Sequence, residues 1–197
     1  MPSSRWVPAD GHVFRARGAA FYTTLVALIA VPVILAAFWP VTARTPAIVL
    51  TAAAGGYWGW VFFWRPLLRV APEEITIVNS WESHRVPWEA LIDVQTHREL
   101  TLVTAQGQYG VQAAPAPGGL ATLRTAMKDR GPAASERTTS DSGAAARVVR
   151  SHWQELVEDG TLDHDDPTKV ATSRLETRVL AVGLALLIAS TAAWILT

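Results

Sequence analysis

The chain has 197 residues, of which 50% are hydrophobic and 17% are charged, and its mean hydropathy is +0.19. An average soluble domain carries roughly 25% charged residues, so the composition favours a membrane protein. The 17 Lys and Arg side chains are balanced by 17 Asp and Glu side chains, which excludes a globally basic nucleic-acid-binding protein. The chain contains no cysteine, which excludes a disulfide scaffold, a cysteine-ligated metal site and a thiol nucleophile.

The chain begins with a short N-terminal tail, residues 1–18, followed by two apolar stretches, residues 19–39 and 46–64. Neither stretch contains Asp, Glu, Lys, Arg or His, and each is close to the ~20 residues with which a helix crosses a bilayer. Because a helix satisfies its own backbone hydrogen bonds in hydrocarbon, we predict a transmembrane hairpin with Pro32 inside its first helix. A buried soluble hairpin and a cleaved signal peptide are the alternatives, although the first apolar run exceeds the ~7–15 residues of a signal peptide.

Residues 65–130 alternate short β-branched runs with turn residues, a pattern typical of antiparallel strands. The predicted strands are residues 67–70, 75–79, 83–86, 91–96, 100–104 and 109–112. Apolar residues then recur at helical spacing, at Leu120, Leu123 and Met127. The segment therefore predicts a small antiparallel β domain that is closed by a C-terminal helix.

Three runs of this domain carry a resemblance: residues 65–70 (Arg-Pro-Leu-Leu-Arg-Val), 75–79 (Ile-Thr-Ile-Val-Asn) and 85–92 (Arg-Val-Pro-Trp-Glu-Ala-Leu-Ile). They resemble the bacterial PH-like domains of the low-molecular-weight-antigen type, in which a transmembrane hairpin commonly leads straight into the sheet. The resemblance covers residues 65–130, about a third of the chain. It implies a membrane-anchored protein with a bent sheet and a closing helix, and it implies no catalytic residues.

Two tryptophans of this domain are candidate contacts for a partner or a lipid surface. Trp81 lies at the tip of a predicted hairpin, where an exposed aromatic side chain favours such a contact. Trp88 follows Pro87 and has two interpretations, packing against the sheet or contact with a ligand. Residues 67–130 hold six basic and seven acidic side chains, so we expect no basic pocket for an anionic headgroup.

Residues 131–143 are rich in Gly, Pro, Ser, Thr and Ala and predict a flexible linker. Residues 144–178 are expected to form a cytoplasmic amphipathic helix and then a juxtamembrane helix. The amphipathic helix should end at Gly160 and carries an apolar stripe formed by Val149, Trp153, Leu156 and Val157. That stripe either packs on the sheet or on a second copy, or it recruits a separate protein through Trp153.

Asp166 and Pro167 have the residue types of an N-cap and a first helical position, and they predict the start of the juxtamembrane helix. The acidic run at residues 163–166 is expected to be a solvated loop, because adjacent residues do not converge on a metal without a shaped loop.

Residues 179–197 predict a third transmembrane helix. Basic residues in short flanking segments stay on the cytoplasmic side. Three arginines precede the first span, two follow the second and two precede the third, whereas the intervening loop holds only Arg44; the seven are Arg5, Arg15, Arg17, Arg65, Arg69, Arg174 and Arg178. This asymmetry predicts a multi-pass protein of the inner (plasma) membrane whose N-terminus and PH-like domain are cytoplasmic and whose C-terminus is outside.

Gly55 and Gly59 form a Gly-x-x-x-Gly pair in the second span. Small residues at this spacing allow close helix contact. The pair packs either against the other two spans or in a homo-oligomer.

The fold class that we predict is membrane α-helical, with three transmembrane helices, plus a small antiparallel β PH-like domain with a C-terminal helix, α+β overall. No nucleophile elbow, phosphate-binding loop, dinucleotide fingerprint or zinc-protease motif occurs in the sequence, so we expect no catalytic residues, cofactor or metal. We expect a non-catalytic interaction or scaffolding module that contacts the bilayer and a protein partner. A lipid- or envelope-sensing module and an accessory subunit of a membrane complex are the alternatives. The candidate contact residues are Trp81, Trp88, Trp153, Arg65, Arg69, Arg174 and Arg178.

Overall fold

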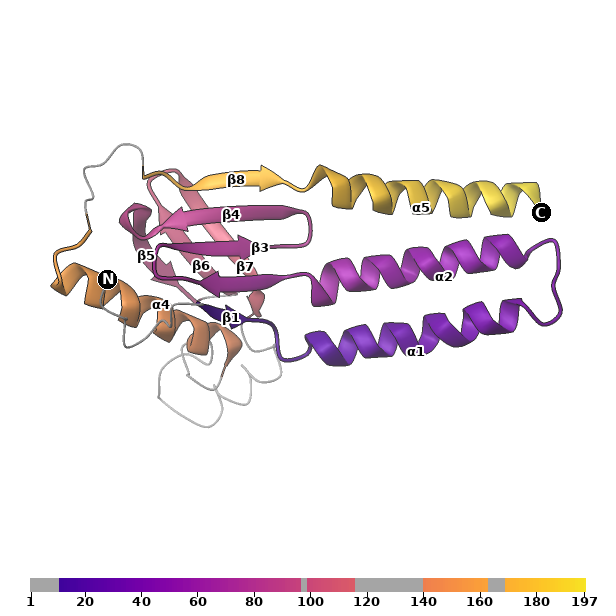
Figure 1. Cartoon of the computed structure of the whole chain (residues 1–197), viewed down its shortest axis with the longest axis horizontal. Coiled ribbons are helices and arrows are strands. Elements are labelled where there is room, and N and C mark those ends of the chain that lie inside the picture. The colour runs from indigo at the N-terminus through magenta and orange to yellow at the C-terminus, as the bar shows by residue number, and fades with distance from the viewer. Residues whose placement is uncertain (1–10, 97–98, 116–139, 163–168) are drawn as a thin grey trace, which may run out of the picture. The chain divides into compact units, whose positions relative to one another are not determined.

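The computed structural model describes residues 11–96, 99–115, 140–162 and 169–197 (Figure 1). The chain divides into two compact units. The helical unit comprises residues 17–65 and 175–197, and the sheet unit comprises residues 1–16 and 66–174. The predicted helix near residues 120–127, most of the predicted linker and the predicted Asp166–Pro167 cap lie outside the described residues.

Three helices make up the helical unit: α1 (Ala19–Ala37), α2 (Thr45–Gly59) and α5 (Thr177–Leu196). α2 continues as the π-helix η1 (Trp60–Trp64), and it packs against both α1 and α5. Within the described residues, these are the three helices that are long and apolar enough to cross a membrane. The three predicted helices are confirmed to within two residues at each end, and Pro32 lies inside α1.

Glycines set how closely these helices pack. A Cβ at Gly183 of α5 would lie 2.5 Å from Cζ2 of Trp58 in α2, and a Cβ at Gly59 of α2 would lie 2.7 Å from Cγ1 of Val26 in α1. Real Cβ atoms do not approach neighbouring heavy atoms so closely. Both contacts with α2 therefore require a residue without a side chain.

Hydrogen bonds at several levels of the unit add to this packing between α2 and α5. The Tyr57 hydroxyl donates to the backbone oxygen of Val179 at 2.8 Å. Nearer the start of α2, the hydroxyl oxygens of Thr51 and Ser190 lie 2.8 Å apart. Nε1 of Trp194 also donates to Oγ1 of Thr51, at 2.9 Å. Polar side chains between apolar helices gain from such partners, because the surrounding apolar side chains offer them none.

The sheet unit contains a five-stranded and a three-stranded sheet. Strands β1 (His12–Phe14), β2 (Leu67–Val70), β3 (Glu74–Val78), β4 (Glu82–Pro87) and β8 (Thr172–Leu175) form the first, in the order β1-β2-β3-β4-β8. Strands β5 (Leu91–Gln95), β6 (Glu99–Thr104) and β7 (Gly107–Pro115) form the second, in chain order. The ladders from β1 to β4 and from β5 to β7 are antiparallel. The six predicted strands are thereby confirmed.

The core of the sheet unit comes from side chains that alternate along the strands, as expected when one face of each sheet is buried. The five-stranded sheet contributes Leu68, Val70, Ile75, Ile77 and Val86, and the three-stranded sheet contributes Leu91, Val94, Leu100, Leu102, Val111 and Ala113. The 3-10 helix η2 (Trp88–Ala90) joins β4 to β5 and buries Trp88 in the same core.

Helix α4 (Asp141–Glu158) packs on the three-stranded sheet, and Ala145, Ala146 and Val149 enter the core. Trp153 and Leu156 pack against that core while partly exposed. Packing on the sheet is thus confirmed for the predicted stripe, except that Val157 is 50% exposed.

The ends of α4 follow from local capping. Oγ of Ser140 accepts a hydrogen bond from the backbone N–H of Gly143 at 2.9 Å, an N-cap that starts the helix three residues before the predicted position. Gly160 has a φ of +64° and Thr161 N–H donates to the oxygen of Leu156, the arrangement of a Schellman motif. The predicted stop at Gly160 is confirmed.

One prediction about the segments that flank the helices is wrong. The predicted juxtamembrane helix is replaced by β8 at residues 172–175, and α5 begins only at Thr177. The N-terminal tail, for which no strand was predicted, contains β1, which pairs with β2. Both strands are three or four residues long and lie at the edges of the five-stranded sheet, so they depend on a neighbouring strand rather than on a local pattern.

Replacing Gly183 tests the contact between α2 and α5. We expect Gly183→Ala to destabilise the helical unit by about 1–3 kcal/mol, because the added methyl group overpacks the Trp58 indole. Gly56→Ala is the matched control, since a Cβ there has no heavy atom within 4 Å. Thermal unfolding of the full chain in detergent should show a lower midpoint for the first variant only. An equal midpoint for both variants would contradict the described packing.

Candidate functional site

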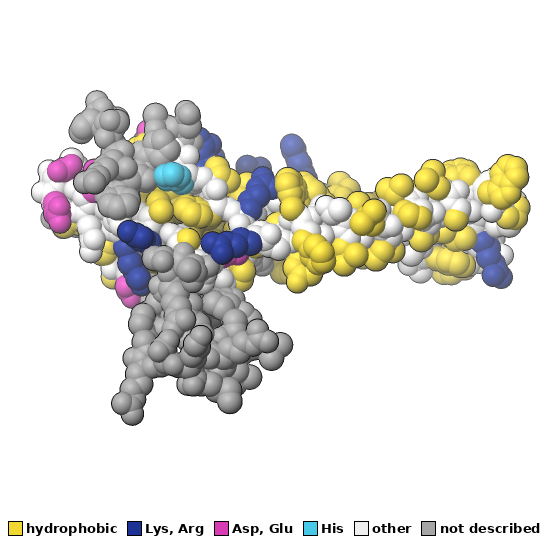
Figure 2. Space-filling model, turned by 90° about the horizontal axis from the view of Figure 1, so that it is seen from below, with side chains coloured by type: hydrophobic (Ala, Val, Ile, Leu, Met, Phe, Trp, Pro, Cys, Tyr) yellow, Lys and Arg dark blue, Asp and Glu magenta, His cyan; other side chains and the backbone are white. Residues whose placement is uncertain are grey.

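Charged side chains of the helical unit lie only at its two ends. Arg17 precedes α1, and Arg65, Glu176 and Arg178 lie where η1 ends and α5 begins, whereas Arg44 lies between α1 and α2. Between these ends the surface is apolar, and Figure 2 shows hydrophobic and uncharged side chains along the helices. Such a distribution is the one expected of a surface that faces hydrocarbon.

Aromatic side chains concentrate at the same two ends. Next to the arginine-rich end, Tyr22 of α1 stacks on Phe63 of η1 with ring centroids 5.2 Å apart. Exposed aromatic residues there are Phe21, Tyr22, Trp60, Phe62, Phe63 and Trp64, and those near the other end are Phe38, Trp39 and Trp194. Aromatic belts of this kind are typical of residues at a membrane–water interface.

The four candidate arginines have different surroundings. Nη2 of Arg65 lies 3.4 Å from Oε2 of Glu176, and the Arg65 side chain is only 10% exposed. Arg65 therefore forms an ion pair with Glu176 inside the helical unit. Arg69 on β2, Arg174 on β8 and Arg178 at the start of α5 are exposed, so these three are the arginines that can reach a ligand.

The two glycines of the Gly-x-x-x-Gly pair have different surroundings. Gly59 lies against Val26, whereas a Cβ at Gly55 would have no heavy atom within 4 Å. Gly55 instead lines an open groove of about 440 Å³ whose other lining residues are Val26, Ile29, Ala30, Val33, Ile48, Thr51, Ala52, Gly56 and Trp194. Only one glycine of the predicted pair takes part in packing within the chain.

Trp88 is buried and is not a contact residue. Its side chain is 2% exposed, Nε1 donates to the backbone oxygen of Ala71 at 3.0 Å, and its ring meets that of His152 edge to face at 4.8 Å. The predicted role as a partner or lipid contact is therefore wrong, and the alternative interpretation as core is confirmed. A buried aromatic residue whose polar atom is satisfied is a structural element.

Trp81 and Trp153 differ in exposure. Trp81 lies in the turn between β3 and β4 and is 38% exposed. Trp153 is half-buried against the core, so most of its apolar surface serves α4 packing. Of the three candidate tryptophans, Trp81 has the surface that a partner or a bilayer can reach.

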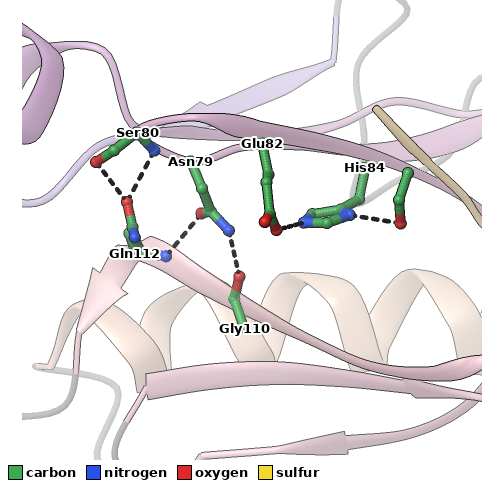
Figure 3. A network of polar contacts seen from close by, with 7 residues as sticks. Asn79, Ser80, Glu82, His84, Gly110 and Gln112 are labelled. Carbon is green, nitrogen blue, oxygen red and sulfur yellow. Dashed lines mark hydrogen bonds and ion pairs between the residues drawn. The ribbon is translucent and has the colours of Figure 1, made fainter. Parts of the chain in front are cut away.

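A polar network next to Trp81 was not predicted from the sequence (Figure 3). The Asn79 side chain donates from Nδ2 to the oxygen of Gly110 at 2.9 Å and accepts from the N–H of Gln112 at 3.1 Å. Ser80, which is 1% exposed, donates from its N–H and its hydroxyl to Oε1 of Gln112 at 2.9 Å each. The turn between β3 and β4 is thereby fixed to β7.

His84 forms a second polar cluster in Figure 3. Its Nδ1 lies 2.8 Å from Oγ of Ser173 on β8, its Nε2 lies 3.6 Å from Oε2 of Glu82, and its ring lies against Tyr109. Burial lowers the pKa of His84, and the nearby Glu82 carboxylate opposes this shift.

Serine, histidine and glutamate are also the residue types of a hydrolase triad. The 3.6 Å from Nε2 of His84 to the Glu82 carboxylate exceeds hydrogen-bond distance, so this carboxylate does not hold the ring as in a triad. We interpret the contact between His84 and Ser173 as a tie between β4 and β8.

Neither a search for metal-binding side chains nor a comparison with known proteins assigns a function to the chain. Among the described residues, no group of three or more His, Cys, Asp or Glu side chains could hold a metal ion. No family model, no curated protein and no solved structure matches the chain.

The surroundings of His84 predict a pH dependence. Since the pKa is lowered in the folded protein, the unfolded chain takes up the proton first as the pH falls below about 6.5. Stability should be full above this pH and decline below it. We expect the fall in unfolding midpoint between pH 7.5 and 5.5 to be smaller in His84→Gln, which cannot titrate, than in the parent or in His12→Gln. The same fall in all three proteins would contradict the prediction.

Proposed function

We propose that the protein is a membrane-anchored, non-catalytic interaction module. The observation that carries the proposal is the helical unit itself, with three helices of membrane-spanning length and apolarity and charged residues only at the ends. A separately packed sheet unit is joined to it through three connections. In the proposed topology the helices lie in the inner membrane and the sheet unit is cytoplasmic.

The orientation rests on the distribution of arginines between the two ends. The end at which η1 stops and α5 begins has Arg17, Arg65 and Arg178, whereas the opposite end has Arg44. The positive-inside tendency favours the first end as the cytoplasmic one. Because the chain enters the sheet unit from that end each time, the sheet unit would be cytoplasmic and Thr197 outside.

A PH-like character of the sheet unit is part of the proposal. Strands β2 to β4 face a second antiparallel sheet, β5 to β7, and a following helix packs on that second sheet. This arrangement supports the fold implied by the resemblance in residues 65–92. Since a fold does not define a ligand, we propose an interaction role from the anchored arrangement and no chemistry.

Topology can be measured by cysteine labelling, because the natural chain has no cysteine. Ala43, between α1 and α2, and Gln106, between β6 and β7, are both exposed. We expect a membrane-impermeant maleimide to label Ala43→Cys in intact cells and to label Gln106→Cys only after permeabilisation. The reverse pattern would overturn the orientation, and extraction of the chain by alkaline carbonate would overturn the membrane anchor.

The interaction role can be tested by photo-crosslinking in cells. A photoreactive residue at Ile92 of β5 or at Val157 of α4, which are 56% and 50% exposed, should form a defined adduct with a protein partner. The control position is Val41, which is 71% exposed and lies between α1 and α2 in the proposed outer loop. An absence of adducts at both sheet-unit positions would contradict the proposed role.

A further inference from the structure

The five-stranded sheet has one rim at which the chain passes to the helical unit. Phe14 at the end of β1 pairs with Leu68, and Leu67 at the start of β2 pairs with Val78 at the end of β3. β8 also ends at this rim, since Ser173 contacts His84 near the start of β4. The connectors to the nearest helices, residues 15–18, 65–66 and 176, are therefore four, two and one residues long.

The turn that presents Trp81 belongs to the same rim, because it joins the end of β3 to the start of β4. The turn is closed by a hydrogen bond from Asn79 N–H to the oxygen of Glu82 at 2.8 Å. The bonds from Asn79 and Ser80 to Gly110 and Gln112 fix its base (Figure 3). The Trp81 side chain, which is 38% exposed, is thus carried on a turn whose base is held by hydrogen bonds.

Basic side chains are exposed near this rim. Arg15 directly follows β1, Arg174 is the next-to-last residue of β8, and both are exposed. Of the acidic side chains nearby, Glu176 is paired with Arg65. Glu82 lies 3.6 Å from Nε2 of His84, and its side chain is 47% exposed, so one exposed carboxylate stands against these two arginines. The balance of six basic and seven acidic residues over 67–130 does not include this local charge, because Arg15 and Arg174 lie outside that range.

We propose that this rim lies on an anionic bilayer surface, with the Trp81 indole in the headgroup layer and Arg15 and Arg174 at lipid phosphates. The proposal rests on the proposed function, because it requires that the helices cross the membrane. A residue spans at most ~3.6 Å, so connectors of four, two and one residues hold the rim close to the membrane surface. Tryptophan favours that layer because one end of the indole is apolar and the other is polar, and arginine near the surface is attracted to anionic lipid.

The test uses the full chain labelled with 5-fluorotryptophan in lipid nanodiscs, with the Trp81 fluorine resonance assigned by its loss in Trp81→Phe. A nitroxide on the lipid headgroup should broaden the Trp81 resonance at least twofold more than that of Trp153. Equal broadening of Trp81 and Trp153 would overturn the proposal if Trp39 and Trp60 of the helical unit are broadened. If none of these four tryptophans is broadened, the chain is not inserted and the proposed function itself fails.

The role of charge has its own comparison. Nanodiscs that contain phosphatidylglycerol should give stronger Trp81 broadening than nanodiscs of phosphatidylcholine alone. Arg174→Gln should reduce this difference by at least half, whereas Arg147→Gln, at an exposed position of α4, should leave it unchanged. Broadening that is independent of lipid charge, or equally reduced by both variants, would overturn the assignment of Arg174 to lipid phosphate.

Discussion

Short connectors between helices and strands constrain the whole chain. The chain passes between its two units three times, through four, two and one residues. Two of these connectors are tied to each other, because Arg65 in one forms an ion pair with Glu176 in another. Segments that would otherwise be tails or loops then enter the sheet as β1 and β8, and one sheet contains strands from three separate parts of the chain.

Side chains bond backbone groups at the edges of the three-stranded sheet, where β5 and β7 have no neighbouring strand on one side. The Asn79 amide bonds two backbone groups of β7, and Arg150 of α4 donates to the backbone oxygen of Val94 in β5. Strand edges that are satisfied in this way are less available for pairing with other chains. Each bond also joins elements that are distant in sequence, so these polar residues hold the two sheets and α4 together.

The sequence was sufficient for features that depend on local patterns. Uninterrupted apolar runs predicted α1, α2 and α5, alternation predicted β2 to β7, and Gly160 predicted the end of α4. β1 and β8 were missed because they are three and four residues long, and β8 is exposed at every position. The network around Asn79 joins residues 31 to 33 positions apart, and nothing local marks such a pair. Trp88 was open to two interpretations because only the fold decides whether its indole is covered, and Gly55 and Gly59 could be told apart only by their neighbours.

The position of β8 in the chain has a consequence for biosynthesis. β8 completes an edge of the five-stranded sheet, and it is translated immediately before α5. Until residue 175 has left the ribosome, β4 has an open edge and His84 lacks the Ser173 hydroxyl. In the proposed topology, closure of the sheet and insertion of α5 therefore fall at nearly the same moment of synthesis. A chain interrupted before that moment would have an unpaired strand edge at β4, a feature that makes incompletely folded chains prone to aggregate.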